Sequence, residues 1–180
     1  MHDHSQGSHG VMNHASMESS LGAADAPHAL QFLDTMIAHH ERAIDMALLA
    51  NTRSQRNEIK TLTQVIIDEQ RREIAEMRSW RTKWFGEAKS AVNVEFPGMK
   101  TGTTGMDTVK LARLKANEFD VEFIKQMIPH HEGAIEMAKA LRSDDRYPEL
   151  QKLADSLIIS QSAEIEQMRG WLAVWSVTAK

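Results

Sequence analysis

The chain carries the same sequence pattern twice, at a constant offset of 91 residues. The sequence MIAHHE at Met36–Glu41 returns as MIPHHE at Met127–Glu132. A second element, QRREIAEMRSW at Gln70–Trp80, returns as QSAEIEQMRGW at Gln161–Trp171. Two elements that keep one register indicate a single supersecondary unit used twice.

Apolar residues in these elements recur with the period of an α-helix. Phe32, Met36 and His40, for example, fall on one helical stripe. The pattern predicts four amphipathic helices, at about 27–51, 54–85, 108–142 and 148–177. Because a hairpin of two helices cannot cover its own apolar face, two hairpins should pair. We therefore expect an all-α fold, a four-helix bundle built from two duplicated hairpins with a long crossover.

The predicted helices divide the 180-residue chain into segments. Residues 1–24 form a polar tail that is rich in histidine and methionine, and 25–180 form the bundle. Repeat 1 covers about 27–85 and repeat 2 about 108–178. The crossover, 86–107, is rich in Gly, Ser and Thr, and Ser143–Asp145 suits a turn.

Composition excludes several classes of protein. The net charge of -4 gives no nucleic-acid surface, and no apolar run is long enough to span a membrane. Cysteine is absent, which excludes disulfides and thiolate sites, while methionine is abundant with 11 residues. The first residues lack the apolar stretch of a signal peptide. The chain is therefore either cytosolic or an exported protein whose signal has been removed.

Four polar residues interrupt the apolar stripes of the second and fourth helices. They are Gln70 and Glu73 and their counterparts Gln161 and Glu164. A buried carboxylate without a partner costs several kcal/mol or becomes protonated. A histidine, a metal ion or an arginine such as Arg78 or Arg169 should therefore satisfy each glutamate.

Histidine pairs beside methionines make the helices candidate metal sites. In an antiparallel hairpin, His40 falls level with Gln70 and near Glu73. The proposed ligands are Met36, His39, His40 and Met46 in repeat 1, and Met127, His130, His131 and Met137 in repeat 2. Glu73 and Glu164 would be oxygen ligands or would orient the histidines together with Gln70 and Gln161, and Met77 and Met168 are further thioethers. Alternatively, the methionines fill the core and the polar residues form a structural network.

The donor set favours a soft metal ion. Di-iron bundles use a Glu-x-x-His motif, which does not occur in the four predicted helices. Imidazole combined with thioether favours copper(I) and, by the same softness, silver(I).

The tail offers a second group of donors. His2, His4, His9, His14, Met12 and Met17 could capture metal ions, or the tail could be a solvated linker. If the mature chain began at His2, then His4 would stand third and suit a tetragonal copper(II) site.

The motifs Met-Ile-x-His-His-x-x-Ala-Ile-x-Met-Ala and Gln-x-x-Glu-Ile-x-x-Met-Arg-x-Trp, each present twice, resemble those of the bacterial DUF305 family. The resemblance covers nearly all of the chain except the tail and crossover. It implies a ferritin-like four-helix bundle that is usually exported. The family includes CopM-type periplasmic proteins that bind copper or silver and support resistance. Pro129 replaces Ala38 in the second copy, so the two sites should be similar but not equivalent.

The leading hypothesis is an exported protein, not an enzyme, that sequesters copper(I) or passes it to an efflux or delivery protein. A ferritin-like oxidoreductase with Glu73, Glu164, His40 and His131 as ligands is the second hypothesis. The third is a metal-free interaction module.

Overall fold

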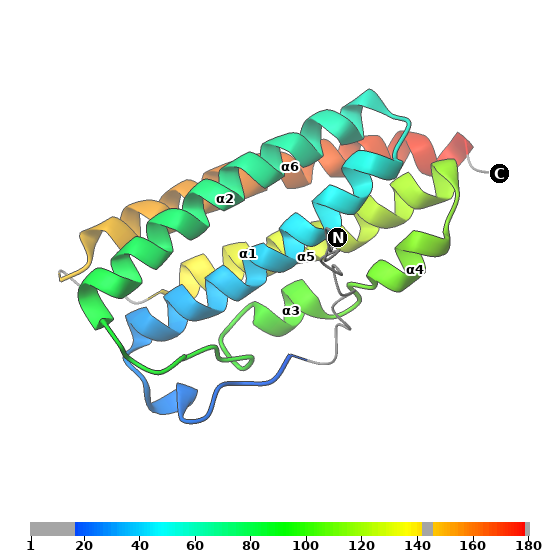
Figure 1. The fold of residues 1–180 in the computed structure, drawn as a ribbon. Coiled ribbons are helices and arrows are strands. Elements are labelled where there is room, and N and C mark those ends of the chain that lie inside the picture. Colours follow the sequence, from blue (N-terminus) through cyan, green and yellow to red (C-terminus); the bar gives the residue numbers. More distant parts are fainter. Residues whose placement is uncertain (1–16, 142–145, 179–180) are drawn as a thin grey trace, which may run out of the picture.

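The computed structural model describes residues 17–141 and 146–178. All regular elements in these ranges are helical, and the long helices form two antiparallel hairpins, α1 with α2 and α5 with α6 (Figure 1). The long helices are α1 (His28–Arg53), α2 (Asn57–Phe85), α5 (Ala116–Ala140) and α6 (Pro148–Thr178), and the short ones are η1 (Ala23–Asp25), α3 (Met99–Thr103) and α4 (Thr108–Arg113). The predicted all-α fold is confirmed. No helix in these ranges has the length and apolar character needed to cross a bilayer.

The second half begins differently from the single helix predicted over 108–142. α4 ends at Arg113, and α5 begins at Ala116, whose φ of 39° lies in the left-handed region. Leu114 and Lys115, which lie between the two helices, have extended backbones and interrupt the helix. The prediction of one continuous helix is therefore wrong at its start. α5 does continue through Pro129. The predicted turn at 143–145 lies outside the described residues.

The crossover after α2 is anchored to α1 by a buried carboxylate. Asp34 accepts a hydrogen bond from Arg81 at 2.7 Å and another from the backbone N–H of Ala91 at 2.8 Å. Asn93 donates its backbone N–H to the Thr35 hydroxyl at 3.0 Å. These bonds hold the crossover against α1 and lead the chain into α3.

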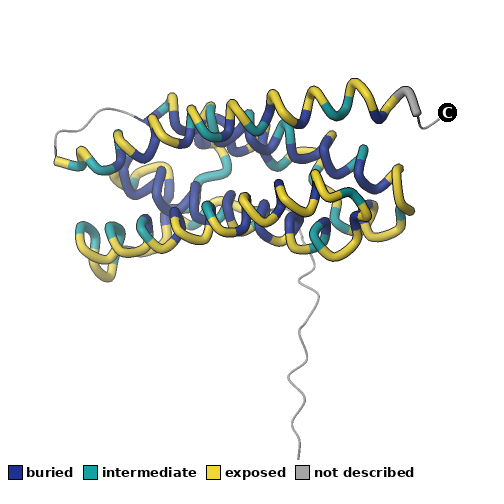
Figure 2. Tube along the Cα trace, turned by 90° about the horizontal axis from the view of Figure 1, so that it is seen from above, coloured by how far each residue is buried: buried dark blue, intermediate teal, exposed yellow. Residues whose placement is uncertain are grey.

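The buried core is divided into two apolar clusters. One contains Phe32 and Leu157, and the other contains Phe123 and Ile66. Buried and half-buried polar residues occupy the positions between the two clusters on every long helix, and we call them the belt: His39, His40, Gln70, Glu73, His130, His131, Gln161 and Glu164. Figure 2 shows buried segments in the middle of the bundle as well as at both ends. The belt therefore crosses the bundle about halfway along its long helices.

Candidate metal centre

Each hairpin contains a buried pair formed by a histidine and a glutamate. His40 Nε2 lies 2.8 Å from Glu73 Oε2, and His131 Nε2 lies 2.6 Å from Glu164 Oε2. A histidine is therefore the partner of each glutamate, which is one of the three alternatives that the sequence left open. With the carboxylate as acceptor, Nε2 carries the proton and Nδ1 keeps a free lone pair. A carboxylate that orients an imidazole in this way is a common partner of metal-binding histidines.

The arginines that were alternative partners lie elsewhere. Arg78 forms an ion pair with Glu41, and Arg169 forms the equivalent pair with Glu132, at N–O distances of 2.5 and 2.7 Å. All four side chains are largely exposed. The two arginines therefore join the helices of each hairpin on the outer surface.

The other two histidines of the belt stack on each other. The rings of His39 and His130 are 3.6 Å apart and nearly parallel, with an interplanar angle of 8°. Because these residues are repeat equivalents, the approximate two-fold axis of the duplication passes between their rings. His130 Nδ1 donates to the Gly102 carbonyl at 2.6 Å, which leaves the Nε2 lone pair free.

Burial keeps both stacked rings uncharged. It lowers the pKa of His130 to about 3, with a further contribution from His131 that the Gly102 hydrogen bond partly offsets. Burial, followed by the neighbouring His130, holds the pKa of His39 well below its ordinary value. Neutral imidazole is the form that binds metal ions, so these rings need not lose a proton to bind one.

Several buried polar atoms of the belt have no hydrogen-bond partner. They are both ring nitrogens of His39, Nδ1 of His40 and of His131, Nε2 of His130, and Oε1 of Gln70 and of Gln161. Buried polar atoms normally have a partner, so this concentration points to a ligand. Within the described residues, no three or more His, Asp or Glu side chains are grouped so that they could hold a metal ion. Thioethers are the soft donors that the chain offers in addition.

The six methionines predicted as ligands are all fully buried. The structure distributes them differently from the repeat-by-repeat sets that the sequence suggested. Met36, Met77 and Met137 lie in the first apolar cluster, and Met46, Met127 and Met168 lie in the second. Each cluster therefore combines methionines from both repeats on one side of the belt.

The sequence pattern did not predict α3, which packs across the stacked histidines. A Cβ atom at Gly102 would lie 2.3 Å from His39 Nε2, and one at Gly133 would lie 2.5 Å from the Gly102 backbone. Gly98 has a φ of 88°, and a Cβ there would meet the Gly133 carbonyl oxygen. Glycine is therefore required at all three positions for α3 to cover the rings.

A difference between the repeats signals this contact. Gly133 stands where the first copy of the motif has Arg42. Arg42 is half-buried, and burial lowers its pKa. Its positive charge contributes to the low pKa of both His39 and His130. One repeat therefore presents a cation at the place where the other receives α3.

Of the tail residues predicted to capture metal, Met17 is half-buried and packs against the first apolar cluster. His2, His4, His9, His14 and Met12 lie outside the described residues.

Residues 29–172 match the model of DUF305, a domain of unknown function. Among solved structures, CopM in its copper(II)-bound form is 42% identical, with a TM-score of 0.70 over 82% of this chain and 97% of that one. CopM in its copper(I)-bound form is 40% identical, with a TM-score of 0.69 over 82% and 96% of the two chains, and CopM has also been crystallised with silver. A putative secreted DUF305 protein from Streptomyces coelicolor is 27% identical, with a TM-score of 0.70 over 83% and 92%.

A curated relative, Uncharacterized protein L153 of Acanthamoeba polyphaga mimivirus, is 40% identical over 53 residues. That match covers 29% of this chain and 35% of the relative, so the chain spans about a third of the relative's length.

Proposed function

We propose that this chain, which belongs to the DUF305 family, binds copper(I), and silver(I) by the same chemistry, at the belt between its two apolar clusters. One observation carries the proposal: five imidazole nitrogens of four buried histidines have no hydrogen-bond partner. The relatives crystallised as CopM with copper(I), copper(II) and silver support the choice of metal.

The proposed donors combine nitrogen and sulfur. Nδ1 of His40 and His131 and Nε2 of His130 carry free lone pairs in the tautomers that their partners impose. Because no three such side chains are grouped around one point in the described residues, thioethers of the flanking methionine sets would complete each soft coordination sphere. Gln70 and Gln161 would orient the ligands or supply a carbonyl oxygen.

The proposed role is sequestration or delivery and not turnover. The neutral, buried rings of His39 and His130 suit a metal that is held away from water. We also propose that the protein works outside the cytoplasm and passes its metal to an efflux or delivery protein. The tail histidines would capture copper(II) or copper(I) before it enters the bundle. The relative described as a putative secreted protein and the absence of cysteine from the chain support this location.

An anaerobic titration of copper(I) against a competing chelator tests the binding site. The full chain is compared with a form that lacks residues 1–16. The shortened form keeps Ser20, because its backbone N–H donates a hydrogen bond to the Val92 carbonyl. Tight binding by the shortened form locates the site in the bundle. If the shortened form bound no copper(I), the metal site would lie in the removed tail, and the proposal of a site in the belt would be refuted.

A variant with His40→Gln and His131→Gln removes two nitrogens while retaining an amide that can donate to each glutamate. We expect affinity to fall at least about tenfold, the range found when groups that support a metal site are removed. The matched control is Glu41→Gln with Glu132→Gln, which changes the exposed neighbours in the same motif. Circular dichroism checks that both variants are folded. Equal affinity in the two variants would contradict the proposal.

The carboxylate–histidine pairs keep a ferritin-like oxidoreductase as the second candidate function. It predicts oxygen consumption when excess iron(II) or copper(I) is supplied in air. Lack of turnover by a chain that binds the metal would dismiss it. A metal-free structural bundle predicts neither stoichiometric binding nor a shift in melting temperature on addition of metal.

A further inference from the structure

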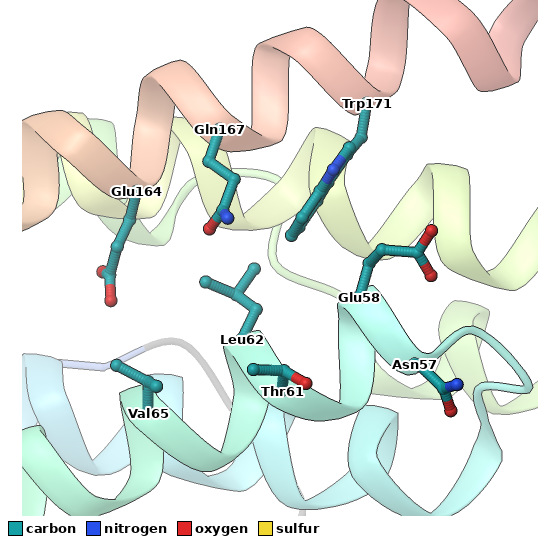
Figure 3. A pocket seen from close by; sticks show the side chains of 8 residues that line it. All are labelled: Asn57, Glu58, Thr61, Leu62, Val65, Glu164, Gln167 and Trp171. Carbon is teal, nitrogen blue, oxygen red and sulfur yellow. The ribbon is translucent and has the colours of Figure 1, made fainter.

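Two cavities lie between α2 and α6 and are related by the internal duplication. The larger, about 460 Å³, is lined by Glu58, Thr61, Leu62, Glu164 and Trp171 among others, and we call it the Glu164 groove (Figure 3). The second, about 290 Å³, has their repeat equivalents Glu149, Lys152, Leu153, Glu73 and Trp80, and we call it the Glu73 groove. Each groove therefore contains the glutamate that is paired with a belt histidine.

The grooves connect the surface with the belt through these carboxylates. Glu164 lines its groove while its Oε2 accepts the hydrogen bond from His131 Nε2. Glu73 does the same for His40 in the other groove. The Glu164 side chain is 13% exposed and that of Glu73 only 4%. A cation in the larger groove would meet a more accessible carboxylate that already contacts the belt.

The opposite face of the belt is covered by α3. α3 lies so close to the stacked rings that a single carbon atom at Gly102 would overlap His39 Nε2. On α1, the Arg42 guanidinium adds a positive charge that acts on both stacked histidines. Steric contact and charge therefore both favour entry from the α2–α6 face.

Charge distinguishes the two grooves. Among the residues that the structure describes, the lining of the Glu164 groove includes Glu58 and Glu164 but no lysine or arginine. The Glu73 groove has Arg72 and Lys152 beside its glutamates, and Arg72 lies 3.9 Å from Glu73. A cleft of one sign with apolar walls focuses the electric field and raises the local concentration of the opposite charge. The Glu164 groove therefore attracts a cation more strongly.

We propose that the Glu164 groove is the port through which a monovalent copper or silver cation enters the belt, with Glu164 as its first protein ligand. The repeat-related Glu73 groove is the slower route because Lys152 and Arg72 repel the cation. This inference rests on the proposed function, because a port requires a site behind it.

The test exchanges one residue between the grooves. Thr61 and Lys152 are repeat equivalents, and both are exposed, so substitution leaves the core unchanged. Thr61→Lys introduces into the Glu164 groove the lysine that the Glu73 groove has at the equivalent position, and Lys152→Thr makes the reverse change. Thr61→Gln is the control that adds bulk without charge. The probe is silver nitrate in chloride-free buffer. Stopped-flow tryptophan fluorescence gives association and release rates, since Trp171 and Trp80 line the two grooves.

We expect Thr61→Lys to slow association about threefold to tenfold, at or below the lower end of the range for electrostatic steering, and more at low salt. Release should slow by a similar factor, because a charge at the port raises one barrier for both directions. Thr61→Gln should change the rates less than Thr61→Lys does. Lys152→Thr should accelerate the slower phase of loading.

Unchanged association in Thr61→Lys, with a wild-type chain that binds silver, would overturn the port and leave the binding proposal intact. Faster release with unchanged association would also overturn it, because the groove would then affect only the bound state. A wild-type chain that takes up no silver would instead refute the proposed function itself.

Discussion

The two repeats contain the same histidine–glutamate pair but cover it differently. His40 with Glu73 and His131 with Glu164 have nearly the same geometry, with N–O distances of 2.8 and 2.6 Å. Outside the pair the repeats diverge: repeat 1 has Arg42 at the position where repeat 2 has Gly133, against which α3 packs. The duplication has thus preserved the buried polar pair while the surrounding surface changed. The comparison teaches that differences between the sites should come from access and charge and not from the pair itself.

The largest effect is expected from Gly133→Arg, which gives repeat 2 the residue that repeat 1 has at this position. A Cβ atom there would lie 2.5 Å from backbone atoms of Gly102, which cannot move aside as a flexible side chain could. We expect the free energy of unfolding to fall by about 4 kcal/mol, above the usual cost of overpacking. Urea denaturation of the metal-free protein measures it.

The reverse change, Arg42→Gly, is the matched control. It removes a half-buried guanidinium and adds a helix glycine, which costs about 1 kcal/mol. Similar losses in the two variants would mean that α3 adds little to the stability of repeat 2.

The second prediction concerns pH and the stacked histidines. The folded protein holds the pKa of His130 at about 3, against 6.5 in the unfolded chain. Above pH 6.5 the ring is neutral in both states. As the pH falls toward 3 only the unfolded chain takes up the proton, so stability is lost across that window. His130 alone should remove about 3 kcal/mol between about pH 6.5 and 4, because the loss approaches about 1.4 kcal/mol per unit only below the unfolded pKa.

Unfolding curves of the chelator-treated protein at several pH values measure this loss. His39→Asn and His130→Asn should each make the profile flatter, because burial lowers the pKa of both rings. If both variants kept the wild-type slope, the acid sensitivity would arise outside the stack.

Much of this architecture could be predicted from the sequence, because the duplication fixes the register of the helices. The apolar period predicted the four long helices, and the cost of burying Glu73 and Glu164 predicted that each needs a partner, with histidine as one of three candidates. These features depend on local periodicity and on pairing within one hairpin. Both can be read from spacing along a helix.

The remaining features depend on contacts between hairpins, which spacing within one hairpin does not determine. The stacking of His39 on His130 and the mixing of methionines from both repeats follow from how α1 packs against α5. The helix break before Ala116 lies at Leu114 and Lys115, whose extended backbones composition does not indicate. α3 depends on three glycines that are meaningful only once Gly102 is seen beside Gly133.

The third prediction compares the two buried pairs directly. Glu73→Ala should cost about 2–3 kcal/mol, because it leaves the His40 N–H buried without an acceptor. Glu164→Ala should cost less, about 1–2 kcal/mol, because its side chain is 13% exposed and water can replace it more easily. Denaturation of the metal-free variants measures both. A larger loss for Glu164→Ala would show that exposure does not control the strength of the pair.

The smallest expected effect concerns the outer ion pairs, where the repeats should be almost equal. Arg78 with Glu41 and Arg169 with Glu132 are exposed, so double-mutant cycles should give a coupling of about 0.5 kcal/mol for each. Arg169 is also shared with Glu166 at 3.2 Å, whereas repeat 1 has an alanine at that position, so its coupling to Glu132 should be slightly smaller. A coupling above about 1 kcal/mol in one repeat alone would exceed the range for exposed pairs. It would mean that the hairpins differ in their own packing, and that access and charge are not sufficient to explain how the two sites differ.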